Sequence, residues 1–238
     1  MKIAFSFQPK TLSKATYGAR TLRRNITLAT VAVTLAVAVP VAARAEPVTI
    51  VALGDSLTAG YGLPEGEGFV PQLQNWLTAQ GADATVINAG VSGDTTAGGL
   101  SRLDWSLTPE TDALIVTLGG NDLLRGLPPT ETRKNMDAIV KQATERGLEV
   151  LIIPMQAPAN YGPEYKTAFD TLYPDIAQTY GARLAMPFFA PLAPDATDLA
   201  DLTPWMQPDG IHPSRDGVAK IVAGLGPTIL ELAQSAAD

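Results

Sequence analysis

The sequence predicts an α/β protein in which helices cover both faces of a mostly parallel sheet. Two observations carry this prediction. Short runs of apolar, mostly β-branched residues recur along the chain, and longer stretches with apolar residues at helical spacing separate them. Near-continuous apolar runs suit strands that are buried on both faces. Their alternation with helices is typical of a parallel sheet.

Four apolar runs are expected to be strands, and each ends in a turn that contains Gly, Asn or Pro. The runs are residues 48–54 (VTIVALG), 84–90 (ATVINAG), 112–120 (DALIVTLGG) and 148–154 (LEVLIIP). In an open parallel sheet, sites form beyond the carboxyl ends of the strands. The residues that directly follow these runs are therefore the first to search for a functional site.

The stretches between these runs are expected to be helices. They cover residues 69–79, 130–146, 165–180 and 214–234. Thr130 is the expected N-cap of the second helix, and Arg146-Gly147 supplies a basic last turn and a glycine stop. Pro174 is expected to bend or end the third helix. The Pro- and Asp-rich stretch 187–209 predicts a long surface loop with no more than one helical turn.

The first 45 residues predict a secretory signal peptide. They contain seven basic residues, no Asp or Glu, an apolar run and the small-x-small pattern Ala43-Arg44-Ala45. An uncleaved membrane anchor is the alternative, but the run is near the minimum for a span and contains Pro40. The pair Arg23-Arg24 leaves twin-arginine export open beside the general route. We expect a periplasmic or secreted protein with no stable membrane anchor and one domain over residues 46–238.

Composition excludes several classes of function. Residues 46–238 contain 10 basic and 24 acidic residues, a net charge of −14, which disfavours nucleic acid and anionic membrane surfaces as partners. The chain has no Cys and a single His, which excludes disulfides, thiolate chemistry and a His-rich zinc site. We therefore expect a small-molecule substrate, no metal and no cofactor. No sustained apolar surface stripe is visible, so a monomer is expected.

Chemically useful residues follow the expected strands. Ser56 stands in GDSL, Gly93 in NAGVSGD, Asn121 in GGND, and both Asp209 and His212 in WMQPDGIHP. Each motif alone also suits a structural role as a helix cap or tight turn. The topology, however, brings all of them to one edge of the sheet, and the only histidine of the chain is among them.

These residues suit acyl transfer by a serine nucleophile. A serine hydroxyl attacks poorly unless a base such as His212 removes its proton, and Asp209 at the spacing D-x-x-H could orient that base. The backbone N–H groups of Ser56 and Gly93 and the side-chain amide of Asn121 are candidate donors to the oxyanion. Gly90 is the alternative to Gly93.

The ordered blocks GDSL, NAGVSGD, GGND and DGIH resemble the SGNH (GDSL) hydrolase superfamily. The longer segments ALGDSLTAGYGL, INAGVSGDTTAGGL, TLGGNDLLRGLPP, APANYGPEY and WMQPDGIHP are similar to its bacterial arylesterase and acyl-CoA thioesterase I / lysophospholipase L1 branch. This resemblance extends over essentially all of residues 46–238. It implies a three-layer α/β/α sandwich with a mostly parallel, flavodoxin-like five-stranded sheet. It also implies the roles given above for Ser56, Gly93, Asn121, Asp209 and His212.

The expected function is therefore that of a serine esterase acting on carboxylic esters or thioesters through an acyl-enzyme. A carbohydrate deacetylase or acyltransferase on the same residues is the alternative, as is a catalytically silent module that binds acylated compounds. The chain contains neither G-x-S-x-G nor a G-x-G-x-x-G that follows a strand. Candidate substrate-binding residues are Asp55, Leu123, Leu124 and Tyr161. The two leucines could equally pack beneath their loop.

Overall fold

The computed structural model describes residues 47–193 and 199–237. The expected signal peptide lies outside these residues. A five-stranded sheet with the order β2-β1-β3-β4-β5 forms the centre of the fold, and all neighbouring strands are parallel. Its strands are β1 (Val48–Gly54), β2 (Ala84–Gly90), β3 (Ala113–Thr117), β4 (Glu149–Ile152) and β5 (Arg183–Leu184). This is the flavodoxin-like order, so the expected fold class is confirmed.

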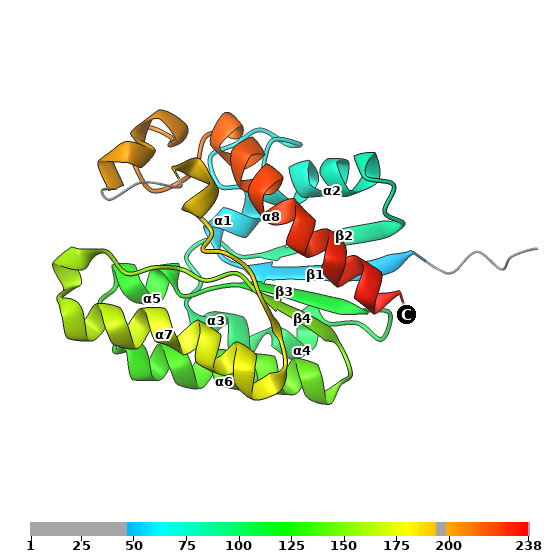
Figure 1. Cartoon of the computed structure of the whole chain (residues 1–238), viewed down its shortest axis with the longest axis horizontal. Helices are drawn as coiled ribbons and strands as arrows, with labels where there is room; N and C mark the ends of the chain where they lie inside the picture. The colour runs from blue at the N-terminus through cyan, green and yellow to red at the C-terminus, as the bar shows by residue number, and fades with distance from the viewer. Residues whose placement is uncertain (1–46, 194–198, 238) are drawn as a thin grey trace, which may run out of the picture. The chain divides into compact units, whose positions relative to one another are not determined.

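Helices cover the sheet on both faces (Figure 1). One face carries α2 (Phe69–Ala79) and α8 (Arg215–Ala236), and the opposite face carries α3 (Thr96–Ser101), α4 (Leu103–Ser106), α6 (Pro129–Glu145) and α7 (Pro163–Tyr180). Two short helices, α1 (Ser56–Ala59) and α5 (Gly120–Leu124), directly follow β1 and β3. Within the described ranges, no helix combines the length and apolar character that crossing a membrane would require.

The core follows from the apolar runs. Every residue of β3 is buried, because this strand lies in the middle of the sheet with helices above and below it. Helix α2 turns Phe69, Val70, Leu73 and Leu77 towards the core, at the spacing of one helical face. Each Å² of apolar surface removed from water contributes about 25 cal/mol to stability. This burial stabilises the fold without any disulfide.

Most of the expected elements are present, with four differences. The resemblance implied a fifth strand, but β5 matches none of the four expected runs, because a strand of two residues has no periodic pattern. Thr130 is not an N-cap, because α6 begins one residue earlier with Pro129 and its cap Pro128 makes no side-chain hydrogen bond. Helix α7 does not end at Pro174 but continues to Tyr180.

The fourth difference concerns the expected surface loop 187–209. This segment contains two 3₁₀ helices, η2 (Ala190–Leu192) and η3 (Leu199–Trp205). It also contributes Phe188, Leu192 and Leu202 to the core. The expectation of an exposed loop was wrong because the count of Pro and Asp hid these spaced apolar residues.

The register of the sheet aligns the carboxyl ends of β1, β2 and β3, so the loops that follow these strands begin side by side. Gly54, the last residue of β1, pairs with Gly90 of β2 on one side and with Thr117 of β3 on the other. β1 and its neighbour β3 lie where the onward connections change faces, because the connection after β1 runs through α2 and the connection after β3 runs through α6 on the opposite face. Such a topological switch point is where open α/β sheets bind ligands. Ser56 lies two residues beyond the end of β1.

Candidate active site

Ser56 lies at the first position of α1, where β1 turns sharply into this short helix. Asp55 is the N-cap, and its Oδ1 accepts a hydrogen bond from the backbone N–H of Leu57 at 3.0 Å. The helix ends after one turn because Gly60 adopts the left-handed conformation with φ of 82°. The turn therefore presents the Ser56 hydroxyl at the carboxyl end of the sheet.

Ser56, His212 and Asp209 form a continuous hydrogen-bonded series. The Oγ of Ser56 lies 2.8 Å from Nε2 of His212, and Nδ1 of His212 lies 2.7 Å from Oδ2 of Asp209. The second carboxylate oxygen of Asp209 accepts from the backbone N–H groups of Ile211 and His212, at 2.9 and 3.0 Å. The backbone and side-chain bonds from His212, followed by that from Ile211, lower the pKa of Asp209 to about 2.

The loop that carries this pair is fixed to α8. Ser214, the N-cap of α8, donates its backbone N–H to the carbonyl of Trp205 at 2.7 Å. Gly217 lies so close that a Cβ there would approach the same carbonyl oxygen to 2.2 Å. The tilted ring of Tyr61 lies 4.7 Å from that of His212, between centroids. These contacts hold the imidazole over Ser56.

The three hydrogen-bond donors expected from the sequence lie in the segments that follow β1, β2 and β3. Among the described residues, none accepts from the backbone N–H of Ser56 or of Gly93. Gly93 has φ of 87°, which disfavours other residues there, and its carbonyl accepts from the guanidinium of Arg125 at 2.7 Å. Asn121 is the first residue after the glycine pair that follows β3.

Gly90 is engaged elsewhere. Its N–H donates to the side-chain oxygen of Asn88 at 2.9 Å. A Cβ on Gly90 would meet the backbone nitrogen of Ala59 at 2.3 Å, so the absent side chain lets α1 pack against the end of β2. This favours Gly93 over Gly90 as the oxyanion donor.

Asp55 is buried directly beneath this site, with only 2% of its surface exposed. Its Oδ2 accepts from the Asn121 side-chain amide at 3.1 Å, which fixes the amide and leaves its second N–H for another acceptor. Burial raises the pKa of Asp55 to about 6, although the bonds from Leu57 and Asn121 oppose the shift. Asp55 also lines the cavity described below, so the substrate contact expected from the sequence stays a prediction.

Arg102 binds the strand ends behind the serine, a role that the sequence did not suggest. Its guanidinium donates to the carbonyl of Gly54 at 2.8 Å, to the carbonyl of Ala89 at 2.7 Å and to Asp94 at 2.6 Å. Gly54 precedes Asp55, and Asp94 follows the candidate oxyanion donor Gly93. One mostly buried cation therefore connects the nucleophile turn with the Gly93 loop.

The buried side chain of Asp122 holds α5, the helix that contains Asn121, in place. Asp122 accepts from the backbone N–H of Thr96 at 2.8 Å, and from the hydroxyl groups of Thr96 and Thr132. This joins α5 to α3 and α6. Asp122 thus fixes the helix on which Asn121 stands.

A cavity of about 480 Å³ opens beside Ser56 and Asn121. Both Leu123 and Leu124 line it, as does the edge of Asp55. Tyr161 is not among the lining residues. Its hydroxyl donates to the carbonyl of Leu123 at 2.8 Å, so it supports the wall from behind. The wall also includes residues that the sequence did not single out: Met155, Phe189, Leu202, Met206 and Ile211.

The described residues contain no group of three His, Asp or Glu side chains arranged to hold a metal ion. The arrangement offers a serine hydroxyl within hydrogen-bond reach of a base, a base with an oriented partner, and backbone N–H groups at Ser56 and Gly93 without an acceptor among the described residues. Such a site can form and stabilise a tetrahedral oxyanion without further groups. Fold and site together are typical of serine hydrolases built on an α/β/α sandwich.

The chain belongs to the GDSL-like lipase/acylhydrolase family, whose model matches residues 52–220. It is 38% identical over 190 residues to the esterase TesA of Pseudomonas aeruginosa, covering 79% of this chain and 91% of that protein. It is 39% identical over 172 residues to thioesterase 1/protease 1/lysophospholipase L1 of Escherichia coli K12, covering 71% and 76%.

A solved structure agrees with these relatives. The crystal structure of AlinE4, a SGNH-hydrolase family esterase, superposes with a TM-score of 0.62 at 42% identity, covering 78% of this chain and 96% of that one. The resemblance derived from the sequence motifs is therefore confirmed at the level of the family.

Proposed function

We propose that this protein is a serine esterase that hydrolyses carboxylic esters or thioesters through an acyl-enzyme on Ser56. The observation that carries the proposal is the unbroken series from the Ser56 hydroxyl through His212 to Asp209, at the edge of a largely apolar cavity. Membership of an acylhydrolase family supports the same reaction class, as do relatives named as esterases and a thioesterase.

The reaction begins with proton transfer. Nε2 of neutral His212 takes the proton of Ser56 as its Oγ forms a bond to the substrate carbonyl carbon. Asp209 keeps the other ring proton on Nδ1 and stabilises the imidazolium that results. A carboxyl whose pKa is about 2 remains ionised at neutral pH, so this support is present throughout the working range.

The carbonyl oxygen becomes negative in the tetrahedral intermediate. It accepts hydrogen bonds from the N–H groups of Ser56 and Gly93 and from the side-chain amide of Asn121. Collapse breaks the bond to the leaving oxygen or sulfur, which takes the proton from His212. Water then repeats the sequence with the acyl-enzyme and releases the carboxylic acid. Removal of one such donor typically costs about 100- to 1,000-fold in kcat.

Leu123, Leu124 and Ile211 give the cavity an apolar wall that suits an acyl chain. The strongly acidic chain suits a neutral or zwitterionic leaving group better than an anionic one. The N-terminal pattern supports export of residues 46–238 to the periplasm or beyond as a single catalytic domain.

The test is hydrolysis of p-nitrophenyl esters by the purified protein beside His212→Ala. We expect the parent to release p-nitrophenol and the variant to lose most of that rate. Asp216→Asn serves as the control, because this exposed carboxylate lies in the first turn of α8 and away from the series. Equal rates in parent and His212→Ala would refute the assignment of His212 as the base.

A further inference from the structure

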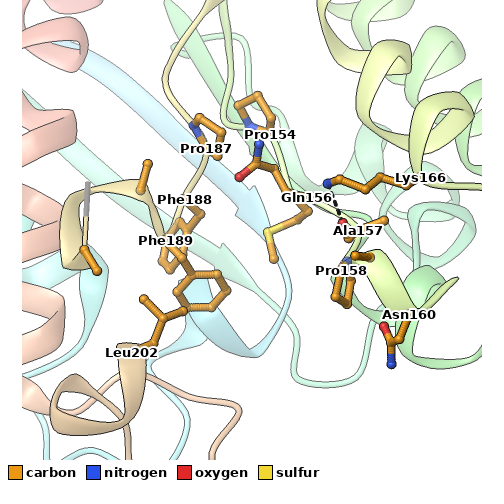
Figure 2. Close-up of a pocket in the computed structure, with 14 residues that line it drawn as sticks. Pro154, Gln156, Ala157, Pro158, Asn160, Lys166, Pro187, Phe188, Phe189 and Leu202 are labelled. Atoms are coloured by element: carbon orange, nitrogen blue, oxygen red, sulfur yellow. Dashed lines mark hydrogen bonds between the residues drawn. The ribbon is translucent and has the colours of Figure 1, made fainter. Parts of the chain in front are cut away.

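A second cavity of about 600 Å³ lies beside the one that contains Ser56 (Figure 2). The segments that follow β4 and β5 form most of its walls. Five residues line both cavities: Met155, Gln156, Pro158, Phe189 and Leu202. The two cavities are therefore neighbours that share one wall, although only the first is lined by Ser56 and Asn121.

The shared wall contains side chains that can adapt. Met155 is buried, and its unbranched thioether chain has three rotatable bonds. Phe189 is half-buried and packs edge-to-face against Phe188, with 5.1 Å between ring centroids. Figure 2 shows Phe188, Phe189 and Leu202 on one side of the second cavity, opposite Pro158 and Asn160.

Most of the side chains that line the second cavity are apolar. Eleven of its 14 lining residues are apolar, and both Phe188 and Ala157 are only 1% exposed. Two of its three polar residues, Gln156 and Asn160, are exposed. This distribution favours an occupant that hides apolar surface and needs few polar partners.

Lys166 is the only ionisable side chain among the lining residues, and its charge is already compensated. Its ammonium donates to the carbonyl of Ala157 at 2.6 Å and to Asp170 at 2.7 Å. An anionic head group would have to compete with Asp170 for this cation. An uncharged occupant avoids that competition.

We propose that the second cavity binds the distal methylenes of a long acyl chain whose carbonyl carbon is attacked by Ser56. This inference rests on the proposed function and narrows its substrate class to long-chain acyl esters or thioesters. A short acyl group fits within the first cavity, whereas a long chain passes the wall at Met155 and Phe189. Each further methylene removed from water is worth about fourfold in binding.

The test compares kcat/KM for p-nitrophenyl butyrate, octanoate, dodecanoate and palmitate. Ala190→Phe and Asn160→Trp fill the second cavity from positions that do not line the first. We expect the palmitate-to-butyrate ratio to fall about tenfold or more in both variants. Because both esters report on the same active molecules, this ratio does not depend on the folded fraction.

Two further variants complete the comparison. Ala79→Phe adds the same ring at the exposed end of α2 and should leave the ratio unchanged. Phe189→Ala opens the shared wall and should raise the ratio. The proposal is wrong if both filling variants still hydrolyse short esters and their palmitate-to-butyrate ratio of kcat/KM is unchanged. Failure of the parent to hydrolyse any ester would instead refute the proposed function, and the acyl site with it.

Discussion

The guanidinium of Arg102 lies 2.8 Å from the carbonyl oxygen of Gly54, two residues before the candidate nucleophile, although 48 positions separate the two in the chain. The same group binds the end of β2 and the loop after Gly93. Arg102 therefore sets the distance between the serine hydroxyl and one of its candidate oxyanion donors without touching the substrate.

Arg102→Ala should lower kcat more than it changes KM, because a misplacement of about 1 Å can cost about 100-fold in rate. Arg102→Lys keeps the charge but cannot make all these bonds, and it should recover only part of the loss. Steady-state kinetics would measure kcat and KM of both variants. Guanidinium added to Arg102→Ala should occupy the vacated site and restore part of kcat. Arg146→Ala is the matched control, because that arginine pairs with Asp104 at the surface.

Asp209→Asn should lower kcat by about three to four orders of magnitude. An amide can donate to Nδ1, which places the ring proton on the nitrogen that must accept from Ser56. KM should change little, because Asp209 does not line the cavity. A variant that retains more than about a tenth of the parental kcat would argue against this role.

The same substitution should alter acid unfolding. The pKa of Asp209 is lowered in the folded protein to about 2 from 3.8. Its contribution to stability is therefore present above pH 3.8 and is lost as the pH falls towards 2. Thermal melts between these values should show a steeper loss in the parent than in Asp209→Asn.

Asp55 should show the opposite dependence, because burial raises its pKa from 3.8 to about 6. Its favourable contribution is complete below pH 3.8 and is lost as the pH rises through 6, a change of about 3 kcal/mol in the free energy of unfolding. In Asp55→Asn this loss should disappear, while kcat falls because the amide cannot accept from both Leu57 and Asn121. Denaturant titrations at pH 4 and pH 8 provide the measurement.

Two glycine variants separate catalysis from packing. Gly93→Ala places a side chain at φ of 87° with its nearest neighbour 3.9 Å away, so the fold should survive while the N–H reorients and kcat falls. Gly90→Ala drives a Cβ into the backbone at Ala59 and should lower the melting temperature markedly. The outcome that would contradict this assignment is a folded Gly90→Ala protein without activity beside a fully active Gly93→Ala protein.

The motifs around Ser56 and Asn121 could be predicted because each follows a strongly apolar strand and the topology gathers strand ends. The motif around His212 follows no strand and was predicted from the block DGIH and from its holding the single histidine. The same reasoning could not find Arg102, since its contacts with the two strand ends are made to backbone carbonyls, which leave no mark on residue type. The contact between Asp55 and the Asn121 amide could not be predicted either, because sequence adjacency to Ser56 does not reveal burial.

The shared wall of the two cavities depends on Phe189, in a segment that was expected to be an exposed loop. Its neighbours Phe188 and Leu192 are both buried, and Leu192 is the last residue of η2. From the sequence alone, Gly93 is preferred to Gly90 only because the block SGDT aligns best with the family. The distinction arises from the partner of each N–H group, which only the folded chain provides.

The placement of Asp209 and His212 within four residues has a mechanical consequence. Carboxylate and imidazole are tied to one another and to the start of α8, so any displacement of that helix carries both as a rigid pair. In the proposed mechanism, a displacement of the start of α8 would therefore change the 2.8 Å distance between Nε2 of His212 and the serine oxygen more than it changes the pairing of His212 with Asp209.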